Sequence, residues 1–440
     1  MSLTVYRITN LLRTLLRRVP IGTNLGLFHL FWALLSGRFL SSRGAVFPAL
    51  AALGLPKEAV RRAAAALTYG RFEVADLLQD WNRAVLEEGG FRPHVHGGIR
   101  PVPVDMSGFS RPKLVGCTTK HYTSQVGKAL PAITLGMVGA TGSVGKSRLC
   151  LPRFLVEAEP TDRSEADHQK RTVRRAAQFL EPNEALILDA GFSHPDLLAM
   201  SGVRYVLRAP RNFTARKNSL PAYKGKGRPP LYGALVRPLS RTYKKKELAA
   251  TPAEGSARWT EGRHTLEALL FEDLVVCEAK PGSSSFRCVV ILDPRYKEPL
   301  VLLTNLPRSV TARDLWLLYR DRWPIEQMPL AAKQMLGAAR SFVFAPQSQV
   351  RLAQLALLAG NVLSYVAATC APVASGFWDR VCRGTCGRLR RVLSVVHFSD
   401  LAVETPETGS AEQVRKKASV TAHLKTGVQA HRRRKAVSER

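Results

Sequence analysis

Four residues in the last third of the chain have types and a spacing suited to handling a phosphate. Tyr319, Arg322, Glu326 and Lys333 follow the pattern Tyr-x2-Arg-x3-Glu-x6-Lys. A helix advances about 100° per residue, so these offsets fall within roughly 60° of one another and predict that all four side chains share one helix face. One carboxylate beside two cations and a phenol suits a phosphodiester held next to a metal ion.

This spacing is rare by chance. With 10 tyrosines, 65 Lys+Arg and 34 Asp+Glu among 440 residues, random placement produces about 0.02 such matches. A solvated, charged helix face is the plainer alternative. Two prolines lie within the pattern. Pro324 suits a first helical turn, whereas an interior proline such as Pro329 costs about 3 kcal/mol or kinks the helix, which affects the placement of Lys333.

Two aspartates upstream stand where a sheet can bring them to one site. Asp105 closes the extended run 99–105, and Asp189 ends the apolar run 185–189. A glycine-containing turn follows each of them, and the carboxyl ends of strands are where an open α/β sheet places its chemistry. Carboxylate oxygens are the ligands that Mg²⁺ prefers, so Asp105, Asp189 and Glu326 together form a candidate magnesium site. As isolated residues, the two aspartates could instead be turn or cap residues.

Together these residues resemble the signature of bacterial insertion-sequence transposases of the Asp-Asp-Glu (DDE) class, in the branch with Tyr-(2)-Arg-(3)-Glu-(6)-Lys. The resemblance covers roughly residues 100–370 and does not extend to the N-terminal region. It implies that Asp105, Asp189 and Glu326 are catalytic and bind two Mg²⁺ ions, for which Mn²⁺ can substitute. By the same resemblance, Asp105 would bridge both ions, and Asp189 and Glu326 would each complete the coordination of one.

The resemblance also implies a role in DNA binding for the other signature residues. Arg322 and Lys333 would hold phosphates of the transposon end, and Tyr319 would position a nearby phosphate or Glu326 itself. The implied activity is cut-and-paste transposition, in which the enzyme binds the terminal inverted repeats of its element and performs strand cleavage and strand transfer. The implied partners are the double-stranded DNA of the transposon ends and of the target, bound by a homodimer in the bacterial cytoplasm at the nucleoid.

The composition independently indicates a polyanionic partner. The chain carries 65 Lys+Arg against 34 Asp+Glu, a formal net charge of +31 and a pI near 10.5, which is typical of nucleic-acid binding. Seven scattered cysteines form no CxxC pair and indicate a reducing cytosol rather than a disulfide framework. No signal peptide is visible, and the apolar stretch 352–371 contains polar residues, so we expect a buried helix there and no membrane span.

The order of extended and helical signals predicts an α/β protein with an RNase H-like catalytic core. Three strands, a helix, a strand, a helix and a strand follow one another, which is the order of an RNase H-like domain. The resemblance predicts the same fold. The runs that carry this order are 100–105, 132–138, 149–156, 164–180, 185–189, 195–200 and 203–207.

We expect five regions along the chain. They are a helical, DNA-binding domain (1–95), the first part of the RNase H-like core (96–210), a β-rich basic insertion that interrupts this core (211–308), its helical second part with Glu326 (309–372) and a C-terminal region (373–440) with a basic tail. A scaffold bundle is an equally good interpretation of the N-terminal helices. The tail is interpreted as disordered and attracted to DNA, or simply as solvated.

The predicted insertion begins in a basic, aromatic-laced segment. Residues 204–246 hold 13 Lys/Arg and no Asp or Glu, which favours contact with phosphates and some stacking on bases over a merely flexible loop. The alternating segments 266–278 and 286–305 predict strands. The candidate DNA contacts in this region are Lys224, Lys226, Arg228, Lys244, Lys245 and Lys246.

Two further motifs indicate different chemistry. Lys146 lies in a relaxed phosphate-loop pattern that would support a DNA-stimulated ATPase, but a helix must follow such a loop, and Pro152 comes soon after in a strand-like run. A glycine-rich hairpin is therefore favoured. His94 and His96 could bind a transition metal from one strand face, but with no third ligand near in sequence we expect a surface pair. A catalytically inactive DNA-binding derivative is the other alternative.

Overall fold

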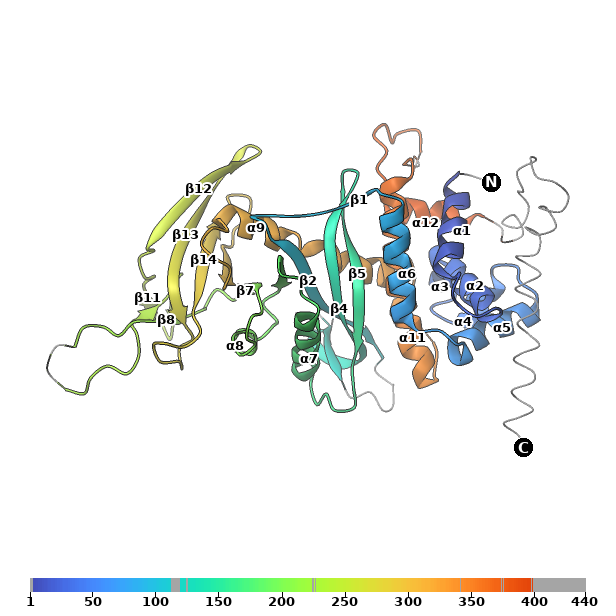
Figure 1. Ribbon diagram of the computed structural model, residues 1–440. Helices are drawn as coiled ribbons and strands as arrows, with labels where there is room; N and C mark the ends of the chain where they lie inside the picture. The colour runs from blue at the N-terminus through green and yellow to red at the C-terminus, as the bar shows by residue number, and fades with distance from the viewer. Residues whose placement is uncertain are drawn as a thin grey trace. The chain divides into compact units, whose positions relative to one another are not determined.

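The computed structural model describes residues 3–111, 119–123, 126–223, 225, 227–340, 342–372, 374, 376–396 and 398 (Figure 1). The chain divides into two compact units, each assembled from distant segments. The first unit contains Met1–Arg92, Met106–Glu165 and Pro324–Arg440, and the second contains Pro93–Asp105 and Ala166–Trp323. The fold is mixed α/β, as the sequence predicts.

Helices dominate the first unit, and six of them lie within residues 3–87. The longest of them, α11, lies beside α6, although the two are far apart in sequence (Figure 1). α6 is strongly amphipathic, and its apolar face, which includes Leu77, Leu78 and Trp81, is buried. The helices are α1 (Leu3–Leu15), α2 (Thr23–Leu35), α3 (Arg38–Ser41), α4 (Val46–Ala51), α5 (Lys57–Tyr69), α6 (Val74–Glu87), α11 (Pro346–Thr369) and α12 (Cys386–Ser394).

A long hairpin in the first unit decides between two interpretations of the Lys146 motif. β4 (Lys128–Val144) pairs antiparallel with β5 (Ser147–Glu157), and the start of β4 pairs antiparallel with β3 (Lys120–Thr123). Val144 lies opposite Ser147, so Gly145 and Lys146 form a two-residue turn, in which Gly145 has φ 57°. Glycine adopts this left-handed conformation without strain. The predicted glycine-rich hairpin is confirmed, and the helix that a phosphate loop requires is not formed, because β5 begins at Ser147.

Helix α11 forms the centre of the first unit. By length and composition it could cross a membrane, but 83% of its most apolar window is buried inside the structure, which agrees with the buried helix predicted there. Gly360 lets it approach closely, because a Cβ there would lie 2.9 Å from the carbonyl oxygen of Met328. Asn361 links three elements, accepting from Trp81 Nε1 (2.8 Å) and donating to the carbonyl of Cys150 (2.6 Å).

We expect Asn361→Leu to destabilise the protein by about 2 to 5 kcal/mol, because it leaves the buried indole of Trp81 and the carbonyl of Cys150 without partners, each at about 1–3 kcal/mol. Urea denaturation measures the free energy of unfolding. The matched control is Ser364→Ala, one turn later, whose hydroxyl bonds mainly to its own helix at Gly360 and should cost under about 1 kcal/mol. Equal losses in the two variants would contradict the proposed importance of the Asn361 network.

The second unit is built on one mixed sheet in the order β2-β6-β7-β15-β14-β13-β8-β9, with β12 also paired to β13. The first three strands are parallel, and the pairings from β7 outward are antiparallel. The elements are β2 (Arg100–Ser110, which continues into the first unit), α7 (Glu165–Gln178), β6 (Glu184–Leu188), α8 (His194–Leu198), β7 (Tyr205–Ala209), β8 (Ala215–Lys217), β9 (Leu235–Val236), β10 (Arg241–Tyr243), β11 (Lys246–Leu248), β12 (Gly255–Glu261), β13 (His264–Val275), β14 (Phe286–Leu292), β15 (Leu300–Thr304) and α9 (Ala312–Arg320).

The strands predicted for the insertion extend this sheet from the edge of β7. β15 pairs antiparallel with β7, β14 with β15, and β13 with β14. The predicted extended run 286–305 is therefore two strands, not one. Alternate residues such as Ile187, Val206 and Leu302 form an apolar core on one sheet face, together with Leu315 and Trp316 of α9.

The expectation that all four signature side chains share one helix face is wrong. α9 ends at Arg320, and then the backbone changes type four times: a 3-10 helix η1 (Trp323–Glu326), α10 (Gln327–Leu330), a π-helix η2 (Ala331–Met335) and a 3-10 helix η3 (Ala338–Arg340). Pro329 lies inside α10, lacks an amide hydrogen and crowds the preceding turn, so a regular helix cannot continue through it. The four signature residues thus belong to several elements and do not share one helix face.

Candidate active site

Strand register brings the two predicted aspartates together. The parallel pairing of β2 with β6 matches each residue with the one 84 positions later, ending at Pro103 and Ile187. Asp189 is also 84 positions after Asp105, so the two residues continue this register two steps further. Neighbouring strands lie about 4.8 Å apart, and residues two apart share a sheet face. Asp105 and Asp189 are therefore adjacent on the face that bears Ile187 and the core under α9.

The next strand adds a residue that the sequence did not single out. The pairing of β6 with β7 runs from Leu186 and Tyr205 to Leu188 and Leu207, and one further step matches Asp189 with Arg208. The Arg208 guanidinium lies 3.8 Å from the Asp189 carboxylate. Arg208 belongs to the basic stretch 204–246, but only the register of β6 against β7 distinguishes it from the other cations there.

Helix α9 supplies the other side of the site. Its first turn is fixed by a capping box between Thr311 and Asp314, which satisfies backbone amides at the helix start. Leu315 and Leu318 pack into the core of the sheet. Residues three and four apart lie on the same helix face. Tyr319 follows Leu315 by four positions, and Arg322, just after the helix, follows Leu318 by four. Both side chains are therefore directed toward the sheet. The packing of the apolar face of α9 on the sheet thus directs Tyr319 and Arg322 toward the ends of β2 and β6.

Arg322 faces both aspartates, and Tyr319 contacts Asp189. The two terminal nitrogens of Arg322 lie 4.0 Å from Asp105 Oδ2 and 3.9 Å from Asp189 Oδ2. The Tyr319 hydroxyl donates to Asp189 Oδ1 at 3.4 Å, and the Arg322 guanidinium lies 5.7 Å from the centre of the Tyr319 ring. The predicted aspartates and half of the predicted signature thus form one cluster within the second unit.

The electrostatics of this cluster suit a cation between the aspartates. Arg322 is only 8% exposed, and a buried guanidinium requires nearby negative charge. Burial and then the charge of Asp189 raise the pKa of Tyr319 above its usual value, so the phenol stays protonated and donates to Asp189. The carboxylates themselves are partly exposed, with 21% and 37% of the side chains of Asp105 and Asp189 accessible. Their carboxylate oxygens are of the donor type that Mg²⁺ prefers, and the guanidinium of Arg322 faces both of them.

Glu326 and Lys333 lie in the first unit. Glu326 ends the 3-10 helix η1 and is partly buried. Lys333 lies in the π-helix η2, with its ammonium 5.2 Å from the centre of the Phe109 ring. π-helical turns often occur at functional sites, and this one follows Pro329. Pro329 was the residue in the sequence that indicated a break in the helix. The spacing of the signature residues could not show that a π-helix would follow it.

The predicted basic contacts are only partly described. Lys224, Lys226 and residues 401–440 of the basic tail lie outside the described residues. Arg228 is exposed, as are Lys244, Lys245 and Lys246. These three lysines belong to a hairpin of β10 and β11 in which Tyr243 lies opposite Lys246. Lys244 and Lys245 occupy its tip with φ 47° and 63°, a type I′ geometry that normally takes asparagine or glycine.

The expectation that His94 and His96 are a surface pair is wrong. Both rings are largely covered and contact Asp321, which is 3% exposed. Burial favours the neutral acid, but hydrogen bonds from the two histidines outweigh it and lower the pKa of Asp321 to about 2. Asp321 lies more than 220 residues from the histidines, so a search for a nearby third ligand could not find it.

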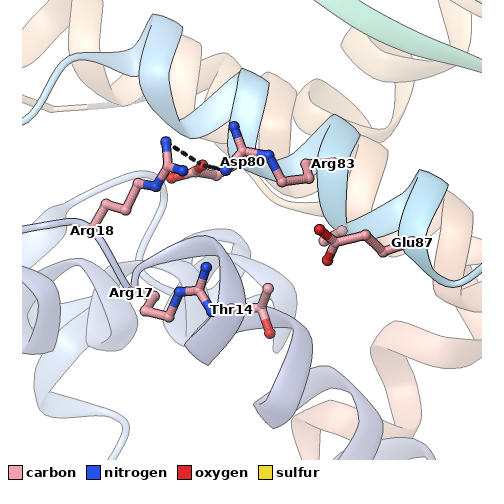
Figure 2. A pocket seen from close by; sticks show the side chains of 7 residues that line it. Thr14, Arg17, Arg18, Asp80, Arg83 and Glu87 are labelled. Atoms are coloured by element: carbon pink, nitrogen blue, oxygen red, sulfur yellow. Dashed lines mark hydrogen bonds and ion pairs between the residues drawn. The ribbon is translucent and has the colours of Figure 1, made fainter.

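A small pocket in the first unit contains other charged residues (Figure 2). Asp80, which is 6% exposed, forms an ion pair with Arg18 at 3.4 Å and accepts a hydrogen bond from Arg83 at 3.3 Å. In Figure 2 these side chains from α6 and the end of the α1 segment point toward one another. Two arginines neutralise one buried carboxylate, which is the arrangement of a structural junction between α1 and α6.

No model of a protein family and no curated protein matches this chain. The function must be inferred from the site itself. Asp105 and Asp189 are aligned by strand register, and Tyr319 and Arg322 face them from α9. Carboxylates can hold a divalent metal, and a neighbouring arginine can hold a phosphate. Phosphoryl transfer uses groups of these two kinds.

Proposed function

We propose that this protein is a DNA transposase of the DDE class, which cuts and rejoins DNA at the terminal inverted repeats of its own element. The observation that carries the proposal is the alignment of Asp105 with Asp189 across β2 and β6, opposite Tyr319 and Arg322. Residues from three distant parts of the sequence, Asp105, Asp189 and the pair Tyr319 and Arg322, all of which the transposase resemblance selects, meet at one place on the sheet.

The strand arrangement supports an RNase H-like core. In the second unit β2 is parallel to β6, and β6 to β7. In the first unit the amide of Arg111, directly after β2, donates to the carbonyl of Pro131 in β4 (2.7 Å), and β4 pairs with β5. In the first unit, therefore, the end of β2 adjoins the β4–β5 hairpin. Helices α7 and α8 occupy the chain positions between β5, β6 and β7, as in the order that the sequence predicts.

By the resemblance, the carboxylates of Asp105, Asp189 and Glu326 would hold two Mg²⁺ ions. When bound, these ions would supply polarisation of the scissile phosphate and stabilisation of the leaving oxygen. Arg322 is placed to bind a phosphate oxygen beside the carboxylates, and Tyr319 holds Asp189 in position through its hydroxyl.

A cleavage assay tests the proposal. The full-length protein is incubated with linear DNA that carries the repeats flanking its gene, with Mg²⁺ or with EDTA, and without ATP. We expect cuts at the repeat ends that require Mg²⁺. Specific binding without cleavage would support the inactive derivative instead. Cleavage that requires ATP would support the ATPase alternative. A strand, not the helix that an ATP-binding phosphate loop requires, follows Lys146.

The β10–β11 hairpin offers a test of where DNA binds. Changing Lys244 to asparagine and Lys245 to glycine removes two charges and introduces the residues that a type I′ turn prefers, so the fold should be unchanged or stabilised. If both lysines contact duplex phosphates, the slope of log K against log salt concentration flattens by about 1.8, because each contact contributes about 0.9. Fluorescence anisotropy at several salt concentrations measures this slope.

The matched control neutralises two exposed lysines outside the basic segment, Lys280→Gln with Lys297→Gln. This variant has the same net charge as the hairpin variant, and its salt slope should equal that of the wild type. Equal slopes in all three proteins would place the DNA away from the β10–β11 hairpin. Loss of binding together with a lower melting temperature in the hairpin variant would mean that the turn was damaged.

A further inference from the structure

Three potential metal ligands converge in the second unit, away from the carboxylate pair. His94 Nδ1 and His96 Nε2 each lie 2.7 Å from the same oxygen, Asp321 Oδ2. One ligand atom from each of the three residues lies within 4.8 Å of the other two. The ring centres are 5.8 Å apart and the rings are inclined by 64°, so the two nitrogens approach the carboxylate from different directions.

Rigid local structure holds these ligands in place. The backbones of His96 and Ile99 exchange two hydrogen bonds of 2.9 Å each, and the tight turn between them uses Gly97 and Gly98 at φ 55° and 80°. Asp321 is the C-cap residue of α9, whose amide donates to carbonyls of the last helical turn. Both anchors are fixed by backbone hydrogen bonds, as a preorganised metal site requires.

We propose that His94, His96 and Asp321 form a binding site for one divalent transition-metal ion of the Zn²⁺ class. Two imidazoles and one carboxylate form the ligand set of open zinc sites, which leave a further position for water. Mg²⁺ favours oxygen ligands, so this site is chemically distinct from the proposed magnesium site at Asp105, Asp189 and Glu326.

The geometry needs only a small adjustment to hold the ion. Zinc bonds of 2.0–2.2 Å in tetrahedral geometry separate the ligand atoms by roughly 3.3 Å, and the two nitrogens now lie 2.7 Å from the carboxylate oxygen. A spread of about half an ångström therefore makes room. The ring proton of each neutral imidazole then resides on the nitrogen that faces away from the ion. The histidine side chains are 20% and 17% exposed, which leaves a route for entry.

The bound ion would connect the start of β2 to the end of α9. The His96 turn leads directly into β2, and Asp321 directly precedes Arg322, the residue that faces both aspartates. We therefore expect the metal to stabilise the second unit by linkage, because an ion that binds only the folded state adds to the free energy of unfolding. This role does not depend on the transposase proposal, since zinc binding and stability are measured without DNA.

Metal binding to the full-length protein tests this proposal. Isothermal titration with Zn²⁺ and visible absorption with Co²⁺ should show one site per chain that His96→Gln and Asp321→Asn remove. The expected loss of affinity is at least about 10- to 100-fold, the effect of losing even an outer partner of a metal ligand. Zn²⁺ should raise the melting temperature of the wild type and leave that of His96→Gln unchanged, with circular dichroism confirming that both are folded.

The chain contains a matched control for this experiment. In the first unit His121 Nδ1 lies 2.6 Å from Glu165, and these side chains are 22% and 23% exposed, but the pair has one histidine only. His121→Gln should keep the zinc site, the cobalt spectrum and the thermal shift. Zinc binding of equal strength in the wild type, in His96→Gln and in His94→Ala, or no zinc binding by the wild type, would overturn the proposal.

Discussion

Asp189→Asn should lower the rate of Mg²⁺-dependent cleavage of repeat DNA by at least about 1,000-fold. A metal ion contributes several kcal/mol to the stabilisation of a phosphoryl-transfer transition state, and each 1.36 kcal/mol is a factor of ten in rate. The substitution keeps the size of the side chain and removes the charge that holds the ion. Asp105→Asn should have the same effect, because strand register gives the two residues equivalent places. The single-turnover rate of strand cleavage measures the loss.

DNA binding separates this effect from misfolding. Neither aspartate carries positive charge, so each variant should bind repeat DNA as tightly as the wild type or more tightly. The matched control is Asp196→Asn, on α8, whose carboxylate pairs with Lys170 and should leave the cleavage rate unchanged. Glu326→Gln should resemble the two aspartate variants. Near wild-type cleavage by any one of the three variants would remove that residue from the metal site.

Arg322→Ala should lower the cleavage rate by about 100- to 1,000-fold, the usual cost of removing one group that stabilises charge in a transition state. It should also destabilise the second unit, because the buried guanidinium separates the carboxylates of Asp105 and Asp189 and its removal leaves like charges facing each other. Mg²⁺ should therefore raise the melting temperature of Arg322→Ala more than that of the wild type, without restoring cleavage.

Two comparisons sharpen the Arg322 experiment. Arg322→Lys keeps the charge but loses the planar fork, so it should regain most of the stability and only part of the activity. Lys146→Ala, at the exposed β4–β5 turn, should keep full stability and cleavage. Full cleavage by Arg322→Ala would show that Arg322 only balances the charge of the aspartates. Loss of an ATPase activity in Lys146→Ala would instead favour the nucleotide-driven alternative.

Local patterns in the sequence were enough to predict much of the fold. The alternation and length of apolar runs located β2, β4, β5, β6 and β7, and the polar interruptions of the stretch 352–371 indicated a buried helix. These patterns reflect which side chains of a segment are buried, and neighbouring residues in the sequence largely decide whether that segment forms a helix or a strand. Asp105 and Asp189 could be selected for the same reason, since the end of an apolar run can be located from neighbouring residues alone.

The sequence by itself was therefore enough to select the candidate carboxylates, to show the signature spacing and to show the basic character of this protein. Only the tertiary structure decided what each residue faces. Register across β2, β6 and β7 aligned Asp105, Asp189 and Arg208, and the packing of α9 on the sheet aimed Arg322 at them. The same packing buried Asp321 against His94 and His96. Such pairings join residues on separate elements, and they depend on how whole elements pack, which no local pattern encodes.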